Sequence, residues 1–466
     1  MIKRIVPNEI ILVLLVGLVF LLGHILKLSP VVSVFILSLV AYLQVSRKNL
    51  RAKSYNLLNL SLLFVIIFVI SYIVAEKGWS PFYIPFAVVP MLAMILFGQL
   101  EVSLLLTVAS SVTIAALYNN DFYIGLLFLV SGVMAAILVR GARSRVKIIR
   151  AGFAIGIMQA LILLLISQFN MSLPKIYLFP FLNGVISSMI VLGVLPVFEY
   201  LFKVVTNISL LELADFNHPL LQRMILEAPG TYHHSLIVGN LSEAACNAVG
   251  ANALLARIGA YYHDIGKLHR PDYFSENQQI KTSAHDELAP TMSRLVIMNH
   301  VKEGVTLANK HKLNLIITDF IQQHHGTSLV YYFYRRAMEN KQEDKEIAEE
   351  GFRYPGPKPD TKEAAIVLLA DSVEAATRAV KDPDPKTIGE VVHKIVNNKF
   401  IDGQLDECDL TLKDLERISA VFIRILTGIY HSRINYPEKK PASESINKKS
   451  SEKNSRLSEK DKKSSS

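Results

Sequence analysis

The first two hundred residues contain eight apolar stretches whose lengths approach that of a bilayer-spanning helix. They lie between Glu9 and Phe202 and are centred near residues 18, 38, 65, 90, 108, 131, 158 and 188. A helix of about 20 apolar residues crosses the hydrocarbon core of a membrane, and a hydrophobic fraction of 51% is too high for an ordinary soluble enzyme. We therefore expect a polytopic helical membrane domain over residues 1–202. The second stretch is short and the fourth contains Pro85 and Pro90, so these two are the weakest predictions.

Basic residues predict the orientation of these spans. They gather at Lys3 and Arg4, at residues 47–53 and at residues 140–150, whereas the connections between these segments are short and hold few of them. Because cytoplasmic loops carry the excess of positive charge, eight spans place both termini in the cytoplasm. No small-residue cleavage site precedes a soluble segment, which favours an anchor over a signal peptide for the first stretch.

The hydrophobic pattern changes at residue 203, beyond which amphipathic helices follow one another with almost no alternating strand pattern. The predicted fold class is therefore all-α throughout. We expect a helical linker over residues 203–230, continuous with the last span from Lys203 to Asp215, then a catalytic domain over 231–436. Residues 437–466 hold nine Lys or Arg against five acids among many serines and predict a disordered tail.

Glycines and small polar residues delimit three helices within the catalytic domain. Thr231 is the expected N-cap of a helix that ends at Gly250. A second helix is expected over residues 252–265, with Gly266 as its stop, and a third from Asn314 to His325. Residues 339–362 read as a charged surface loop over the site, because three prolines lie within five residues there.

Histidines and aspartates recur in the catalytic domain in an order that predicts a binuclear metal site. Twelve of the thirteen histidines lie beyond residue 203. Both cysteines lie there too, but two cysteines are too few for a structural zinc site. The candidate metal ligands are His234, His263, Asp264, His300, His324, His325 and Asp371. Imidazole nitrogens and carboxylate oxygens suit divalent transition metals, and one carboxylate can bridge two of them. The remaining histidines, such as His233, His218 and His285, are interpreted as structural.

Three of the candidates have additional support from their neighbours. Asp371 is the only acid between Ala364 and Ser372 and follows a run of apolar residues, and a buried carboxylate requires a cation or hydrogen-bond donors. Asp264 is the natural bridging ligand, because a carboxylate can bridge two metal ions. Lys267, three residues further on, would lie on the metal side and neutralise a phosphate oxygen. Together these features predict a metal-dependent phosphohydrolase with Asp264 and Lys267 in catalytic roles.

The same motifs carry a family resemblance. The series resembles the HD-domain phosphohydrolases, and its context looks like the seven-transmembrane HD family of cyclic-di-AMP phosphodiesterases (PgpH-type). The matching segments are Gly-Thr-Tyr-His-His234-Ser, His263-Asp-Ile-Gly-Lys, His324-His-Gly-Thr-Ser-Leu-Val, Phe352-Arg-Tyr-Pro-Gly-Pro-Lys-Pro and Leu369-Ala-Asp371-Ser-Val-Glu-Ala-Ala. The resemblance covers residues 31–202 and the catalytic domain to about residue 436, and leaves out the first span and the tail.

This resemblance implies a ligand set, a reaction and partners. His234, His263, Asp264 and Asp371 would hold one metal, and Asp264, His300, His324 and His325 the other. Two divalent ions, iron or manganese, would serve the hydrolysis of cyclic-di-AMP to linear 5′-phosphoadenylyl-adenosine. The expected partners are the cyclic dinucleotide and the lipid bilayer, here the inner membrane of a bacterial cell. No nucleic-acid polymer is expected as a partner, and homodimer formation is left open. Family members usually carry a large extracytoplasmic domain after the first span; here only a few residues join the first two spans, so we expect this external sensor to be lacking.

Two other functions remain open from the sequence. An HD hydrolase of another nucleotide, cyclic-di-GMP or guanosine tetraphosphate, has similar ligands, although the former usually shows Gly-Tyr-Pro after its His-His pair. Here Gly326 and Thr327 follow the pair instead. The third possibility is a membrane receptor or transporter whose HD domain only binds nucleotide. Few charges lie within the spans, which disfavours ion transport.

Overall fold

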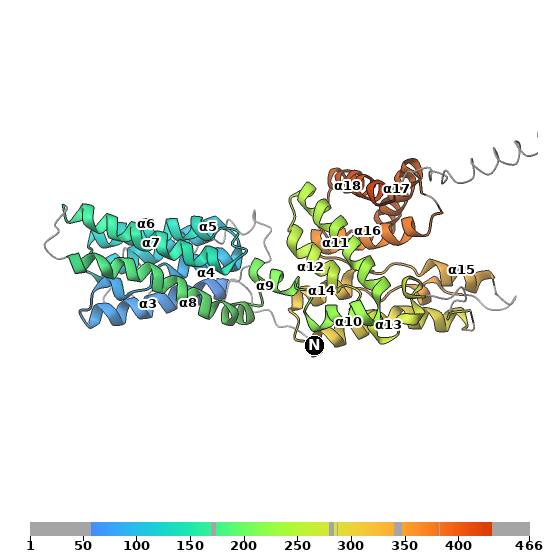
Figure 1. Cartoon of the computed structure of the whole chain (residues 1–466), viewed down its shortest axis with the longest axis horizontal. Helices are drawn as coiled ribbons and strands as arrows, with labels where there is room; N and C mark the ends of the chain where they lie inside the picture. Colours follow the sequence, from blue (N-terminus) through green and yellow to red (C-terminus); the bar gives the residue numbers. More distant parts are fainter. Residues whose placement is uncertain are drawn as a thin grey trace, which may run out of the picture.

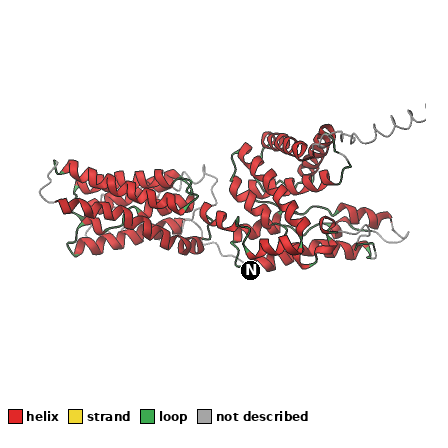
Figure 2. Cartoon of the chain, in the orientation of Figure 1, coloured by secondary structure: helices red, strands yellow, loops and turns green. Residues whose placement is uncertain are grey.

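The computed structural model describes residues 57–168, 174–278, 284–286, 288–339, 347–381 and 383–430. Helices make up these ranges, and the single β-bridge, between Leu329 and Arg353, forms no strand there (Figure 2). The all-α prediction is therefore confirmed. A bundle of long apolar helices and a second, more polar helical unit lie side by side, and α9 lies between them (Figure 1). The first two predicted spans and the tail fall outside the described residues.

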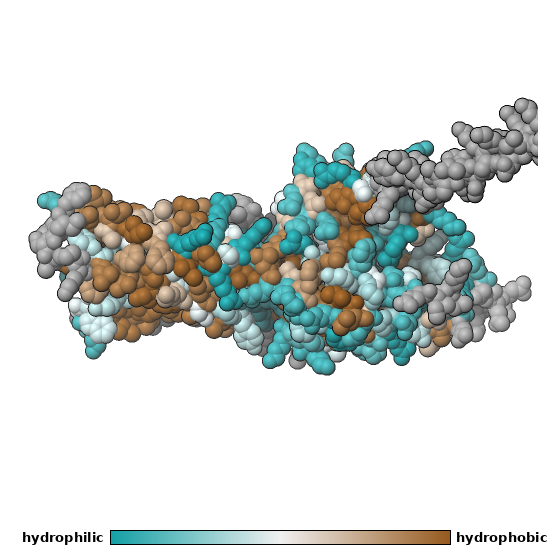
Figure 3. All heavy atoms as spheres, in the orientation of Figure 1, coloured by the Kyte–Doolittle hydropathy of each residue, from teal (hydrophilic) through white to brown (hydrophobic). Residues whose placement is uncertain are grey.

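Five helices of the bundle are long and apolar enough to cross a membrane. They are α3 (Leu57–Glu76), α5 (Leu100–Leu117), α6 (Phe122–Val139), α7 (Arg145–Ile166) and α8 (Leu178–Phe202). Their outer faces are apolar as well, as Figure 3 shows over this half of the molecule. On α7, for example, Ile157, Leu161 and Leu165 are each more than half exposed, as suits a lipid-facing surface. The chain is therefore a membrane protein.

The fourth predicted span is a short internal helix. Residues 81–83 form a 3-10 turn, η1, and α4 covers only Val88–Phe97, which is about 15 Å of helix and half of a bilayer core. Pro90 lies in the first turn of α4, where a missing N–H costs no helical hydrogen bond. Asn183 of α8 donates to the carbonyls of Phe82 and Ile84, at 2.8 and 2.7 Å. Irregular backbone at this depth is thus satisfied from within the protein.

The linker is helical but does not continue the last span. Lys203 adopts a left-handed conformation with φ 55° and ends α8. Thr206 then caps the separate helix α9 (Asn207–Leu213), and α10 (Pro219–Glu227) follows. The prediction of one continuous helix from Lys203 to Asp215 is wrong, because helix periodicity in sequence does not reveal a single left-handed residue between two helical segments.

Eight further α-helices and four 3-10 turns build the catalytic domain, and three buried apolar clusters hold them together. The α-helices are α11 (Pro229–Val249), α12 (Ala253–Tyr262), α13 (Pro290–Lys310), α14 (Leu315–Gln323), α15 (Tyr331–Glu339), α16 (Lys362–Arg378), α17 (Pro385–Ile401) and α18 (Leu412–Tyr430). The 3-10 turns are η3 (Ile265–His269), η4 (Pro271–Tyr273), η5 (Ser275–Asn277) and η6 (Glu349–Phe352). Helix α16 runs through the largest of these clusters, with residues 364–371 all buried.

Several predicted boundaries shift when tertiary contacts decide them. Helix α11 starts at Pro229, with Ala228 as N-cap, so Thr231 lies inside the first turn. Proline at the first helical position is favourable because its fixed φ suits the helix, and the Thr231 N–H is accepted by the Asn277 side chain at 3.1 Å. Gly250 does end α11, in a left-handed conformation. Helix α12 ends at Tyr262, and Gly266 lies within the 3-10 turn that follows.

Candidate metal centre

Five helices bring the seven predicted ligands to one place. His234 projects from the first half of α11, and Asp371 from the middle of α16. His263 and Asp264 follow α12 directly, and His324 and His325 follow α14. His300 comes from α13. Residues at helix ends and in helix middles thus supply ligands to the same buried volume. At most two of these ligands are adjacent in the sequence.

The first ligand group contains His234, His263, Asp264 and Asp371, whose candidate ligand atoms all lie within 4.8 Å of one another. The His234 Nε2 lies 3.0 Å from the Asp371 Oδ1, and the His263 Nε2 lies 3.0 Å from the Asp264 Oδ2. All four residues are buried. The structure therefore gathers two nitrogens and two carboxylates, a set that suits a transition metal.

The second ligand group contains His300, His324 and His325. The Nε2 atoms of His300 and His324 lie 3.1 Å apart. Both also face the Asp264 Oδ1, at 3.4 and 3.6 Å. The two oxygens of Asp264 consequently face different groups, since its Oδ2 is the atom near His263. His325 also lies near the first group, with its Nδ1 3.5 Å from the Asp371 Oδ2.

Hydrogen bonds on the outer nitrogens fix the tautomers of these imidazoles. The Nδ1 of His300 donates to the Ile297 carbonyl at 2.6 Å, and that of His324 to the Ile321 carbonyl at 2.9 Å. A neutral imidazole that donates through Nδ1 carries a lone pair on Nε2. In the neutral form of both rings, the two Nε2 atoms would point lone pairs at each other across 3.1 Å. A cation between them would turn this repulsion into coordination, so the arrangement fits a metal.

Unpaired buried atoms support the same fit. The His263 Nε2 and the Asp264 Oδ1 lack hydrogen-bond partners within the described residues, although each is buried. Leaving buried polar atoms unsatisfied is costly. The 3.0 Å approach of His263 to Asp264 lacks hydrogen-bond geometry, and a metal bound by both would account for it.

Burial and neighbouring charges shift the pKa values of several ligands. Burial lowers the pKa of His300 to about 4, so this imidazole is neutral. Burial alone would raise the pKa of the Asp264 carboxyl, but His263 and Lys267 hold it well below its usual range. Burial also opposes protonation of His263, yet Asp264 and Asp371 raise the pKa of His263 to about 10. A bound metal would displace this proton, because ligands must be deprotonated.

Lys267 lies on the metal side, as the sequence predicts, and is held there by two acids. Its Nζ lies 2.8 Å from the Asp264 Oδ2 and 2.6 Å from the Glu276 Oε1. These partners raise its pKa against the effect of burial. Lys267 thus keeps one oxygen of Asp264 oriented, and most of its charge is already compensated within the protein.

Sequence reasoning missed Glu374, which supports His234. Its Oε2 accepts from the His234 Nδ1 at 2.5 Å, and its side chain is 1% exposed. A carboxylate on the outer nitrogen orients a metal-binding imidazole and raises its basicity. The available signal was the spacing: Glu374 lies three residues after Asp371 and therefore on the same face of α16. Glu276 was also missed, and no feature of its sequence neighbourhood points to it.

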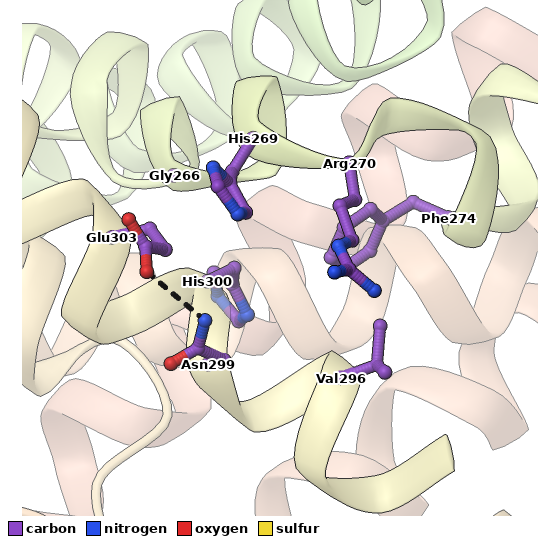
Figure 4. A pocket seen from close by; sticks show the side chains of 8 residues that line it. All are labelled: Gly266, His269, Arg270, Phe274, Val296, Asn299, His300 and Glu303. Carbon is purple, nitrogen blue, oxygen red and sulfur yellow. Dashed lines mark hydrogen bonds between the residues drawn. The ribbon is translucent and has the colours of Figure 1, made fainter. Parts of the chain in front are cut away.

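A close backbone approach positions His300 against Asp264. A Cβ added to Gly266 would meet the His300 carbonyl oxygen at 1.8 Å and the Gly304 nitrogen at 2.5 Å. Turn η3 and helix α13 can therefore pack this closely only with glycine at position 266. Figure 4 shows the small groove between them, in which Asn299 donates to Glu303 at 3.1 Å beside His300.

The predicted surface loop does contact the centre. Tyr354 stacks on His325 with ring centroids 4.3 Å apart, and its backbone N–H donates to the Ser328 carbonyl at 3.0 Å. Among the histidines interpreted as structural, His285 hydrogen-bonds the Tyr273 carbonyl and His218 caps α10. His24 and His431 lie outside the described residues.

Both halves of the chain match families of known proteins. Residues 10–206 match the model of a 7TM receptor with intracellular HD hydrolase, and residues 231–376 match the HD domain. The first match begins within the first predicted span, which the sequence analysis had left outside the resemblance.

Two curated relatives are both described as cyclic-di-AMP phosphodiesterase PgpH. The Bacillus subtilis protein is 39% identical over 87% of this chain and 59% of its own length; the Listeria monocytogenes protein is 39% identical over 83% and 54%. The chain thus spans little more than half the length of these relatives. The L. monocytogenes PgpH HD domain, crystallised in complex with cyclic-di-AMP, is 45% identical over 46% of this chain and 100% of that chain, with a TM-score of 0.45. Because both halves of the chain match, this chain belongs to the family of seven-transmembrane receptors with an intracellular HD hydrolase domain.

Proposed function

We propose that this chain is a membrane-bound phosphodiesterase that hydrolyses cyclic-di-AMP to linear 5′-phosphoadenylyl-adenosine. The observation that carries the proposal is the placement of Asp264 between two groups of ligand atoms, one facing each carboxylate oxygen. Binuclear sites of this type occur in enzymes that cleave phosphate esters. The names of the two relatives support the choice of substrate.

The proposed ligand sets follow the two groups. His234, His263, Asp264 and Asp371 would hold one ion, and Asp264, His300, His324 and His325 the other. Iron and manganese suit this mixture of imidazole and carboxylate. Two bound ions would lower the pKa of an attacking water and neutralise charge on the phosphate. The protein's own part is to orient the imidazoles through their outer nitrogens, to hold Asp264 through Lys267, and to limit the access of bulk water.

The proposal is tested by assaying the purified chain with manganese or iron against cyclic-di-AMP, cyclic-di-GMP and guanosine tetraphosphate. We expect cleavage of cyclic-di-AMP with the linear dinucleotide as product. Preferential cleavage of another nucleotide would establish a different HD hydrolase. Tight binding without cleavage, in a fully metal-loaded protein, would establish a receptor.

We also propose that the catalytic domain faces the cytoplasm. The support is the excess of basic residues at 140–150, at the end of the bundle from which α7 starts, where Arg145 pairs with Glu212 of α9. Reporter fusions test this orientation. A periplasmic reporter active after Lys203, or a cytoplasmic reporter active between Asn119 and Asp121, would overturn it.

A further inference from the structure

The metal centre is most exposed on the side of His325, which we call its open side. The side chains of His234, His263, Asp264, His300 and His324 are at most 2% exposed. Those of His325 and Asp371 are 20% and 10% exposed. Of the seven ligands, His325 is therefore the most accessible to a phosphodiester, and charges near it bear on substrate binding.

Lys399, on α17, lies on this open side. Its Nζ donates to the Ser328 Oγ at 2.6 Å. Ser328 closes a turn with His325, because its N–H donates to the His325 carbonyl at 3.0 Å. Burial lowers the pKa of Lys399, and the charge of Asp371 opposes this shift. Lys399 is thus one hydrogen bond away from the turn that carries the most exposed ligand.

The charge of Lys399 lacks an ion-pair partner among the described residues. The nearby carboxylate of Asp402 is taken by Arg353, through contacts of 2.8 and 3.1 Å. The hydrogen-bond partner of Lys399 is the neutral hydroxyl of Ser328. Burial lowers the pKa of the Lys399 ammonium. Lys267 differs, because two carboxylates compensate its charge. An ammonium with spare donors beside an open metal centre suits an anionic ligand.

We propose that Lys399, held by Ser328, is a phosphate-binding residue that contacts a non-bridging phosphodiester oxygen of the substrate. The inference rests on the proposed function and adds to it the cation that receives the dinucleotide at the open side. An ammonium has three donors, of which Ser328 occupies one. Lys399 therefore binds substrate without coordinating metal.

The test compares Lys399→Met with Lys394→Met in the full-length, manganese-loaded chain. Lys394 lies on the same helix and is exposed, so it controls for loss of a positive charge from α17. We expect Lys399→Met to raise KM for cyclic-di-AMP about 10-fold or more, which corresponds to about 1.4 kcal/mol. Metal content and Tm should match the wild type. Lys399→Arg should restore part of the affinity, and Ser328→Ala should raise KM less than Lys399→Met does.

Two results would overturn the proposal. One is a kcat/KM for Lys399→Met within twofold of that for Lys394→Met. The other is loss of metal or of folding in Lys399→Met, which would make the residue structural. Bis(p-nitrophenyl) phosphate, a phosphodiester without nucleosides, separates this inference from the proposed substrate. If the wild type cleaves it but not cyclic-di-AMP, the substrate proposal fails, and Lys399→Met is then compared with Lys394→Met on that probe.

Discussion

The membrane bundle and the catalytic domain are both helical, but they treat buried polar side chains differently. In the bundle, several hydroxyls donate to a carbonyl one turn back in their own helix, as Thr107 does to Ser103 and Ser131 to Leu127, at 2.7 and 2.6 Å. In the catalytic domain, the ligand imidazoles turn their Nε2 atoms toward other helices. Polar groups satisfied within one helix need no ligand, whereas lone pairs that converge from several helices do. Gln159 departs from the bundle's pattern, since its buried amide lacks a partner in the described part of the chain.

The largest effect is expected where the two ligand groups meet. Asp264→Asn replaces the carboxylate that faces both groups with a neutral amide, which cannot bridge two cations. We expect cyclic-di-AMP hydrolysis to fall at least about 1000-fold, or about 4 kcal/mol of barrier, and metal content to fall with it. His263→Ala should behave in the same way. Elemental analysis and circular dichroism accompany the assay, because full metal loading with full activity would refute the assignment.

A substitution in the bundle should affect stability. A Cβ on Gly184 of α8 would lie 2.4 Å from the Gly156 nitrogen of α7, so these helices require small residues at their contact. We expect Gly184→Ala to destabilise the bundle by about 1–3 kcal/mol, measured as thermal unfolding in detergent. Gly193→Ala on the same helix is the matched control, since an added Cβ there meets nothing within 4 Å. Equal stability of the two variants would contradict this packing.

Glu374→Gln should weaken the centre without dismantling it. The amide can still accept a hydrogen bond from the His234 Nδ1, but the carboxylate charge that raises the basicity of this imidazole is lost. We expect metal affinity to fall about 10- to 100-fold, as measured by competition with a chelator. Excess metal should restore most of the activity. An unchanged metal affinity would limit Glu374 to a packing role.

The smallest effect concerns separation of the two regions. Helix α9 divides its contacts, since Ile208 belongs to the bundle's core and Leu210 to a core of the catalytic domain. The two larger apolar clusters of the catalytic domain contain only residues beyond position 203. We expect residues 205–436 to hydrolyse cyclic-di-AMP within about one order of magnitude of the full chain, or about 1.4 kcal/mol. If the isolated part is metal-loaded but inert, the bundle contributes more than an anchor.

Sequence determined the helical class, the membrane segments and the identity of the candidate ligands. Apolar runs of bilayer length admit little other than transmembrane helices. The His-Asp and His-His pairs could be found because adjacent ligands stand out at the end of an amphipathic helix. Asp371 could be found because an acid in an apolar run must have a partner. These signals are local, so each is visible within one turn or two of the chain.

Tertiary structure decided which ligands share a group, how they are oriented and which side is open. The pairing of His300 with His324 depends on the contact of α13 with η3 at Gly266, across more than thirty residues. Glu276 reaches Lys267 only because η5 packs against the start of α11. The short α4 likewise depends on Asn183, which supplies hydrogen bonds from α8 to a segment about 100 positions earlier. Contacts between distant segments leave no periodic trace in the sequence, because each partner is selected by packing in three dimensions rather than by its neighbours along the chain.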